Sequence, residues 1–224
     1  MEFLILIFAL MGASWYVGHT LKKRFDKYAQ VPVRSGLSGK EVAEKMLHDN
    51  GIYDVEIISV QGKLTDHYNP LNKTVNLSPE VFQGRSVAAA AVAAHECGHA
   101  IQHATSYSWL KMRSALVPLV SFSSRIVPWI LIAGILMIEA FPGLLLAGIL
   151  LFATTTLFSV VTLPVEIDAS NRALAWLNNS NITRGEEHVM AKDALKWAAR
   201  TYIVAALSSL ATLLYYVMIY MSRR

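Results

Sequence analysis

The chain has 224 residues, of which 54% are hydrophobic and only 16% charged, and its net charge at neutral pH is +4. Soluble domains carry about 25% charged residues, so this composition excludes an ordinary soluble domain and indicates a membrane protein. A single cysteine, Cys97, excludes an internal disulfide framework.

The N-terminal residues 1–21 predict a transmembrane anchor. Residues 3–21 contain no acidic residue, lysine or arginine, and a helix of that length spans about 28 Å, close to the hydrocarbon thickness of a bilayer. A cleaved signal peptide would place basic residues before the apolar run, whereas in this chain they follow it. The positive-inside rule therefore predicts an N-terminus outside the membrane and a cytoplasmic location from residue 22 onward.

Residues 22–113 are polar enough to form a small folded segment. Ser38 and Glu41 have the spacing of a capping box, which predicts a helix that ends at Asn50-Gly51. Three short strands with turn residues between them are expected next, over residues 53–60, 63–68 and 74–78. The last strand is either a sheet edge, where an extended peptide substrate could pair with its backbone, or a plain core strand.

Two helices are predicted to complete this segment. Ser78 and Pro79 suit the N-cap and the first position of a short helix. A longer and mostly apolar helix is predicted over roughly residues 86–104, and it contains the stretch "HECGH".

Residues 114–164 predict a transmembrane hairpin. The apolar runs over about 116–138 and 143–163 are each long enough to cross a bilayer, and Pro142-Gly143 supplies the turn between them. Pro164 then suits the first turn of a new helical segment.

Residues 165–200 are polar again and are expected on the same side of the membrane as residues 22–113. Residues 201–224 supply a fourth span, with several tyrosines near one membrane interface. Four spans place both termini outside and both polar segments in the cytoplasm.

The stretch "HECGH" has the pattern H-E-x-x-H. His95 and His99 lie four residues apart, so one helix face presents both imidazoles to a single metal ion. Glu96 lies about 100° around the helix from His95 and can accept a proton from a zinc-activated water without binding the metal. The pattern also arises by chance, but two histidines and a glutamate are costly in an apolar helix unless they are paired or coordinated. The stretch therefore predicts a zinc-dependent peptide hydrolase.

A catalytic zinc site needs a third protein ligand and an open position. His103 lies on the same helix face but about 6 Å beyond His99 along the axis, too far to share one ion on a straight helix. Glu166 is the preferred third ligand, because the predicted hairpin returns it to the side that holds His95 and His99. Asp168 is its rival.

Other polar residues are candidates for supporting a ligand histidine or for stabilising an oxyanion. Asp168 and Arg172 have the spacing of a favourable helical ion pair, and Asp168 could also accept the spare N–H of a ligating histidine. The remaining oxyanion candidates are His67, Tyr68, His188 and Tyr202. Cys97 points away from the face of the two histidines and is expected to be a packing residue.

With "HECGHAIQH" and "LPVEIDASNRAL" both present, the whole chain resembles the YugP-type family of bacterial neutral zinc membrane peptidases. It is more distantly similar to the HtpX and CAAX-prenyl endopeptidase gluzincins. In that group H-E-x-x-H is followed by E-x-x-x-D, and here Ser170 stands at the position of the aspartate. The resemblance implies a zinc ion held by His95, His99 and Glu166, with Glu96 as the general base.

The sequence therefore predicts a mainly α, multi-pass protein of the bacterial plasma membrane. About four transmembrane helices would carry a small α+β gluzincin-like zinc peptidase domain on the cytoplasmic face. Its expected function is that of a zinc metalloendopeptidase acting on membrane or misfolded proteins, with protein or peptide substrates and the lipid bilayer as partners and no nucleic acid.

Two other functions are alternatives to the endopeptidase. A non-catalytic, metal-binding membrane scaffold is the alternative, although a structural site has no use for the base Glu96. A site-2 type intramembrane protease would carry an Asp-Gly motif on a later span, and the sequence contains none.

Overall fold

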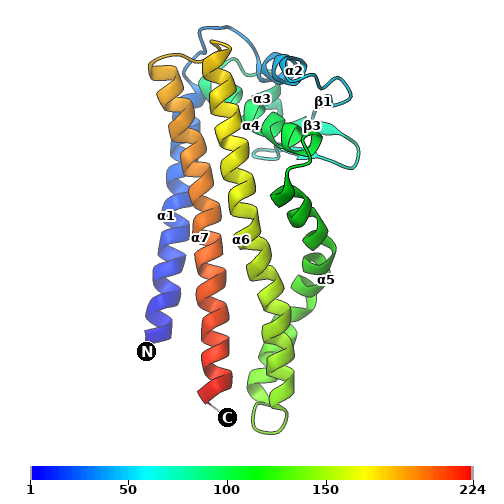
Figure 1. The fold of residues 1–224 in the computed structure, drawn as a ribbon. Helices are drawn as coiled ribbons and strands as arrows, with labels where there is room; N and C mark the ends of the chain where they lie inside the picture. Colours follow the sequence, from blue (N-terminus) through cyan, green and yellow to red (C-terminus); the bar gives the residue numbers. More distant parts are fainter. Residues whose placement is uncertain (1, 223–224) are drawn as a thin grey trace. The chain divides into compact units, whose positions relative to one another are not determined.

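The computed structural model describes residues 2–222, which are mainly helical with one small sheet (Figure 1). The chain divides into two compact units. The first, here called the helix unit, comprises Met1–Trp15, Ser108–Pro164 and Thr201–Arg224, and the second, here called the mixed unit, comprises Tyr16–Tyr107 and Val165–Arg200. Three long helices contribute residues to both units: α1 (Glu2–Ala29), α6 (Pro142–Asn179) and α7 (Glu186–Ser222).

Three helices in the described part of the chain are long and apolar enough to cross a membrane: α5 (Ser108–Leu136), α6 and α7. The predicted hairpin is present, since α5 and α6 are joined by a short loop and run in opposite directions (Figure 1). The first predicted span lies within α1, which continues as one helix through the basic residues after it. Its crossing of the membrane stays a prediction, and Met1 lies outside the described residues.

The predicted helix break at Pro164 is wrong. Helix α6 runs through Pro164 without interruption. A proline inside a helix removes a single N–H donor, and long membrane helices tolerate that loss when neighbouring groups satisfy the freed carbonyl. The polar stretch after the third predicted span therefore begins as a direct extension of the apolar helix.

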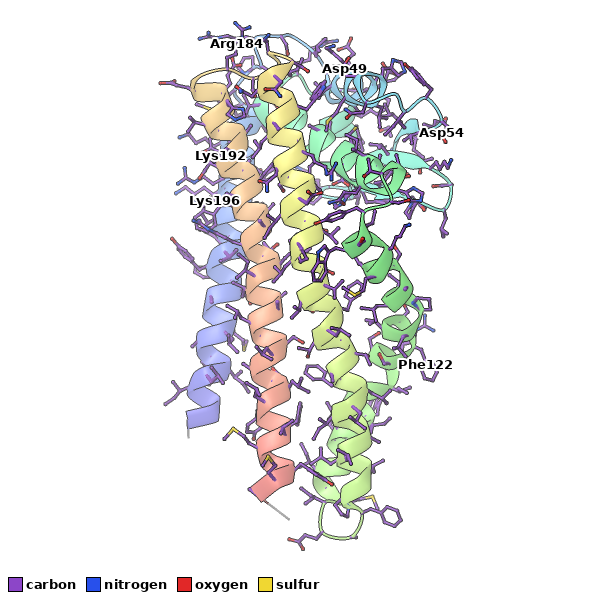
Figure 2. The ribbon with its side chains drawn as sticks, in the orientation of Figure 1. Asp49, Asp54, Phe122, Arg184, Lys192 and Lys196 are labelled. Atoms are coloured by element: carbon purple, nitrogen blue, oxygen red, sulfur yellow. The ribbon has the colours of Figure 1, made fainter. Side chains whose placement is uncertain are left out.

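Small residues allow α5 and α6 to pack closely within the helix unit. A Cβ atom on Gly134 would lie 2.6 Å from Leu145 Cα, so the two backbones meet at this glycine. Val127 and Leu131 of α5 pack with Leu145 and Ile149 of α6 in a buried cluster. Other large apolar side chains of these helices are exposed, as Figure 2 shows for Phe122 on α5, and such side chains suit a lipid environment.

The mixed unit contains the remaining helices and the sheet. The predicted helix is α2 (Gly39–Asp49), and its capping box is formed, with Ser38 and Glu41 bonded to each other as expected. The three predicted strands are β1 (Glu56–Ser59), β2 (His67–Asn69) and β3 (Thr74–Leu77). Strand β2 begins later than predicted, because residues around Leu64 form a turn in which that residue has a positive φ.

The sheet order is β1-β3-β2, with β1 parallel and β2 antiparallel to β3. Strand β3 is therefore the central strand, and all four of its residues are buried. Of the two expectations for this segment, the core strand is correct and the sheet edge is wrong. The edge strand that contacts the H-E-x-x-H helix is β2.

Helix α4 (Val87–Ala104) is the central helix of the mixed unit, and it follows the short helix α3 (Pro79–Phe82). Its N-terminus is capped by the Ser86 hydroxyl, which accepts a hydrogen bond from the Ala89 N–H. The alanine-rich half of α4 is buried, and it packs against side chains of α2, β3, α6 and α7. Because the alanine side chains are small, several elements can approach the backbone of α4 closely.

Candidate metal centre

Two histidines of α4 and one glutamate of α6 converge in the mixed unit. One ligand atom from each of His95, His99 and Glu166 lies within 4.8 Å of the others. The Glu166 Oε2 atom is 3.3 Å from His95 Nε2 and 3.6 Å from His99 Nε2. Glu166 and His99 are buried, and His95 is half-buried. Of the two acids proposed as third ligand, the structure brings Glu166 and not Asp168 into this cluster.

The close crossing of α4 and α6 explains how the three groups meet. A Cβ atom on Gly98 would lie 2.6 Å from Ala169 O and 3.0 Å from Ala169 Cα, so the backbones of the two helices touch at this point. Gly98 directly precedes His99, and Ala169 lies about one turn after Glu166. The glycine of "HECGH" therefore permits the approach that carries Glu166 to the histidines.

Both imidazoles turn their Nε2 atoms toward Glu166 and bond through Nδ1 to other residues. His95 Nδ1 is 3.1 Å from the Ser170 hydroxyl on α6. His99 Nδ1 is 3.1 Å from Gln102 Oε1 on α4. Of the two alternatives for Asp168, the structure has the ion pair with Arg172, since Ser170 and Gln102 are the Nδ1 partners of the two histidines.

The donor set fits zinc. Two imidazole nitrogens and one carboxylate oxygen are the protein ligands in one class of catalytic zinc site. In that class, the fourth coordination position is open to water or substrate. The two rings are nearly perpendicular, with centroids 4.8 Å apart, so their Nε2 atoms approach one region from different directions. Burial lowers the pKa of His99, but the Glu166 carboxylate raises it more, and the pKa lies above its ordinary value. The carboxylate and the imidazoles thus attract each other in this arrangement.

Glu96 is buried beside the cluster and bonds to the sheet. Its Oε2 atom accepts a hydrogen bond of 3.0 Å from the Tyr68 N–H on β2. The Tyr68 N–H is thereby directed away from β3, with which β2 forms its ladder. The edge strand β2 therefore orients the carboxylate of Glu96.

Apart from Tyr202, the other predicted candidates bond to residues outside the three-residue cluster. The Tyr68 hydroxyl bonds to His103 at 2.8 Å, and Arg172 bonds to Asp168 at 2.6 Å. His67 contacts Thr65 O, and His188 contacts Thr183. Tyr202 belongs to the part of α7 in the helix unit. His103 thus joins the end of α4 to β2 and is separate from the metal cluster.

Cys97 is a packing residue, as expected. It is fully buried, and its Sγ atom lies 3.6 Å from Ala43 O on α2. Burial raises the pKa of the Cys97 thiol, so that it stays protonated. No role was predicted for Gln102 or Gly98, although Gln102 lies three residues after His99, a spacing at which helical side chains meet.

A protein with helices long and apolar enough to cross a membrane, in which an H-E-x-x-H helix meets a glutamate from a later helix, has the features of a zinc metallopeptidase. The family described as "Putative neutral zinc metallopeptidase" matches residues 3–221, and the chain belongs to this family. Zinc is the cofactor of the family, and the resemblance noted in the sequence is confirmed.

The chain is also similar to a curated bacterial protein. It is 41% identical over 224 residues to "Putative membrane protease YugP" of Bacillus subtilis (strain 168), and the match covers 100% of this chain and 99% of the relative. No solved structure matches the chain.

Proposed function

We propose that the protein is a zinc-dependent, membrane-anchored endopeptidase that hydrolyses peptide bonds of membrane or misfolded proteins near the cytoplasmic face. The observation that carries this proposal is the convergence of His95, His99 and Glu166, with the buried carboxylate of Glu96 next to them. Membership of a zinc peptidase family and the apolar helices support the same conclusion.

Each residue of the site has a defined task in this proposal. His95, His99 and Glu166 hold the zinc ion through two Nε2 atoms and a carboxylate oxygen. When bound, zinc supplies Lewis-acid activation of water and of the scissile carbonyl. Glu96 accepts a proton at its carboxylate and then delivers it to the leaving amine nitrogen. The Tyr68 N–H keeps the Glu96 carboxylate in place during both transfers.

The scaffold alternative is less consistent with these residues. Structural zinc sites are closed by four protein ligands, whereas the cluster found among the described residues offers three. A buried carboxylate is also costly, and Glu96 is buried without belonging to the ligand cluster. A general base explains the presence of Glu96, and a purely structural ion does not.

A cavity of about 300 Å³ in the mixed unit is suited to an apolar substrate side chain. It is lined by residues of α1, α3, α4 and the loop before β2, among them Phe25, Leu64, Val81 and Val92. Val92 lies one helical turn before Glu96 on the same face of α4. We therefore expect cleavage next to apolar residues, which membrane and unfolded proteins expose.

The proposal is tested by substituting Glu96→Gln in the full chain, purified in detergent and loaded with zinc. The zinc content should remain that of the wild type, while casein cleavage should fall by about 10²- to 10⁴-fold, the usual contribution of a general base. The exposed Glu44→Gln on α2 is the matched control and should cleave normally. Sequencing of the casein fragments should show apolar residues enriched beside the cleaved bonds.

Two results would contradict the proposal. Casein cleavage by Glu96→Gln at the rate of the wild type would remove Glu96 from the chemistry. Tight zinc binding by a wild-type protein that cleaves no casein would support the scaffold function instead.

A further inference from the structure

We propose that Gln102 is a positioning residue that fixes the tautomer and ring orientation of His99 for zinc binding. The inference rests on the proposed function only in that zinc is taken to bind His95, His99 and Glu166. It assigns a task to a residue for which neither the motif nor the family description provides one.

Gln102 is completely buried, with 0% of its surface exposed, and its side-chain amide is fully hydrogen-bonded. The Nε2 atom donates to Val165 O at 2.8 Å and to Asp168 Oδ2 at 2.8 Å, both on α6. The Oε1 atom lies 3.1 Å from His99 Nδ1. One amide therefore joins the second histidine of α4 to the helix that supplies Glu166.

These partners determine which way the amide faces. A backbone carbonyl and an ionised carboxylate are acceptors only, so the atom that faces Val165 and Asp168 must be the NH₂ group. The Gln102 oxygen then faces His99, and the hydrogen between them must belong to His99 Nδ1. The His99 Nε2 atom consequently carries a lone pair on the side of Glu166, as a metal ligand requires.

Asp168 is itself held in place. The Arg172 Nε atom donates to Asp168 Oδ2 at 2.6 Å, and the Arg172 guanidinium lies 5.8 Å from the centre of the Tyr107 ring. The ion pair predicted from sequence thus exists, and it acts on His99 through Gln102. Arg172 and Gln102 both donate to the Oδ2 atom of Asp168, so Asp168 is the acceptor that keeps the amide of Gln102 in one orientation.

The two histidines differ in the hydrogen-bond partner of Nδ1 and therefore in the tautomers that this partner permits. The partner of His95 is the Ser170 hydroxyl, which can donate or accept a hydrogen bond and so permits either tautomer. The partner of His99 is an amide oxygen that can only accept. His99 is therefore the ligand whose tautomer the protein sets before zinc arrives, and its zinc-binding geometry depends on Gln102.

The test is the zinc affinity of the full chain in detergent, measured by competition with a chromogenic chelator. Gln102→Met keeps the side-chain length but removes the acceptor, and it should weaken zinc binding by about 10- to 100-fold, as is usual when the partner of a ligating histidine is lost. Gln102→Glu retains an acceptor for His99 Nδ1 but places its second oxygen against Val165 O and Asp168, so it should recover only part of that loss. Gln61→Met, in an exposed loop, is the control and should bind zinc as the wild type does.

A second readout separates positioning from a merely structural role. In the cobalt-loaded protein, the visible absorption bands report the ligand geometry, and they should change more in Gln102→Met than in Gln102→Glu. Asp168→Ala tests the same contacts at a partly exposed position, where the substitution should leave the protein folded. We expect it to weaken zinc binding about two- to tenfold, the effect of one net hydrogen bond.

The inference is overturned if Gln102→Met binds zinc as tightly as the wild type, or if the Met and Glu variants lose the same affinity while both stay folded. Should Gln102→Met fail to fold, unchanged zinc affinity in Asp168→Ala overturns it equally. None of these measurements uses proteolysis, so they are separate from a failure of the proposed function. That failure would appear as a zinc-binding wild-type protein that cleaves no casein, and the zinc affinities of the Gln102 variants would still decide the role of Gln102.

Discussion

The hydrogen bond between Tyr68 and Glu96 gives the edge strand a task in the proposed chemistry. Proline at position 68 would remove the N–H that orients the carboxylate, and it would remove no bond of the β2–β3 ladder, because this N–H points to Glu96. We expect Tyr68→Pro to cleave casein about 10- to 100-fold more slowly, the effect of a lost hydrogen bond to a charged group. Zinc content should be unchanged.

Tyr68→Ala is the matched control, because it also removes the ring and its hydroxyl bond to His103 but keeps the backbone N–H. The two variants should therefore differ in casein cleavage measured at saturating zinc. Equal rates for the proline and alanine variants would show that the side chain, rather than the N–H, supports the activity.

At the scale of single residues, the sequence located the groups whose relation is local. His95, Glu96 and His99 lie within five residues, and helix geometry alone places the two imidazoles on one face. Gln102 was missed because its partners Val165 and Asp168 are 63 and 66 residues away along the chain. Ser170 was noted only through its place in the E-x-x-x-D pattern, and its contact with His95 also joins separate helices.

At the scale of whole elements, the crossing of α4 and α6 depends on Gly98. An alanine Cβ at this position would lie 2.6 Å from Ala169 O, so α6 would have to move away. We expect Gly98→Ala to destabilise the fold by about 1–3 kcal/mol, as overpacking of a filled contact usually does. It should also weaken zinc binding, because α6 carries Glu166, and the two effects are measured by thermal unfolding and chelator competition.

Gly12→Ala provides the comparison for this prediction. Gly12 is also helical, on α1, and a Cβ atom there has no neighbour within 4 Å. Alanine favours a helix over glycine by about 1 kcal/mol, so this variant should be neutral or slightly more stable. If Gly98→Ala unfolds and binds zinc in the same way as Gly12→Ala, the close crossing does not hold the site together.

The sequence predicted the existence of most elements but not their arrangement. The capping box of α2 and the three strands follow from local patterns, and the structure has them. The order β1-β3-β2 depends on contacts between strands, so the sequence left open whether β3 lies at the edge or in the core. The wrong prediction at Pro164 has a similar origin, since a local preference for helix starts was overruled in a long helix.

At the scale of the whole molecule, the orientation in the membrane is a prediction from the distribution of basic residues. The single cysteine makes it testable, because Cys97 is fully buried and burial raises the pKa of its thiol. The thiolate is the nucleophile that attacks a maleimide, so the native chain should not react with this reagent. New cysteines at exposed positions will then report their own location without a background signal.

Two positions, one before α5 in the chain and one after it, decide the orientation. Leu71 lies between β2 and β3 and is 94% exposed, and Phe141 lies between α5 and α6 and is 66% exposed. Since α5 is the candidate span between them, a membrane-impermeant maleimide should label Phe141→Cys in intact spheroplasts. It should label Leu71→Cys only after the membrane is permeabilised, because positive charges favour the cytoplasmic side. The reverse pattern would place the H-E-x-x-H helix outside, and labelling of both from one side would show that α5 does not cross the membrane.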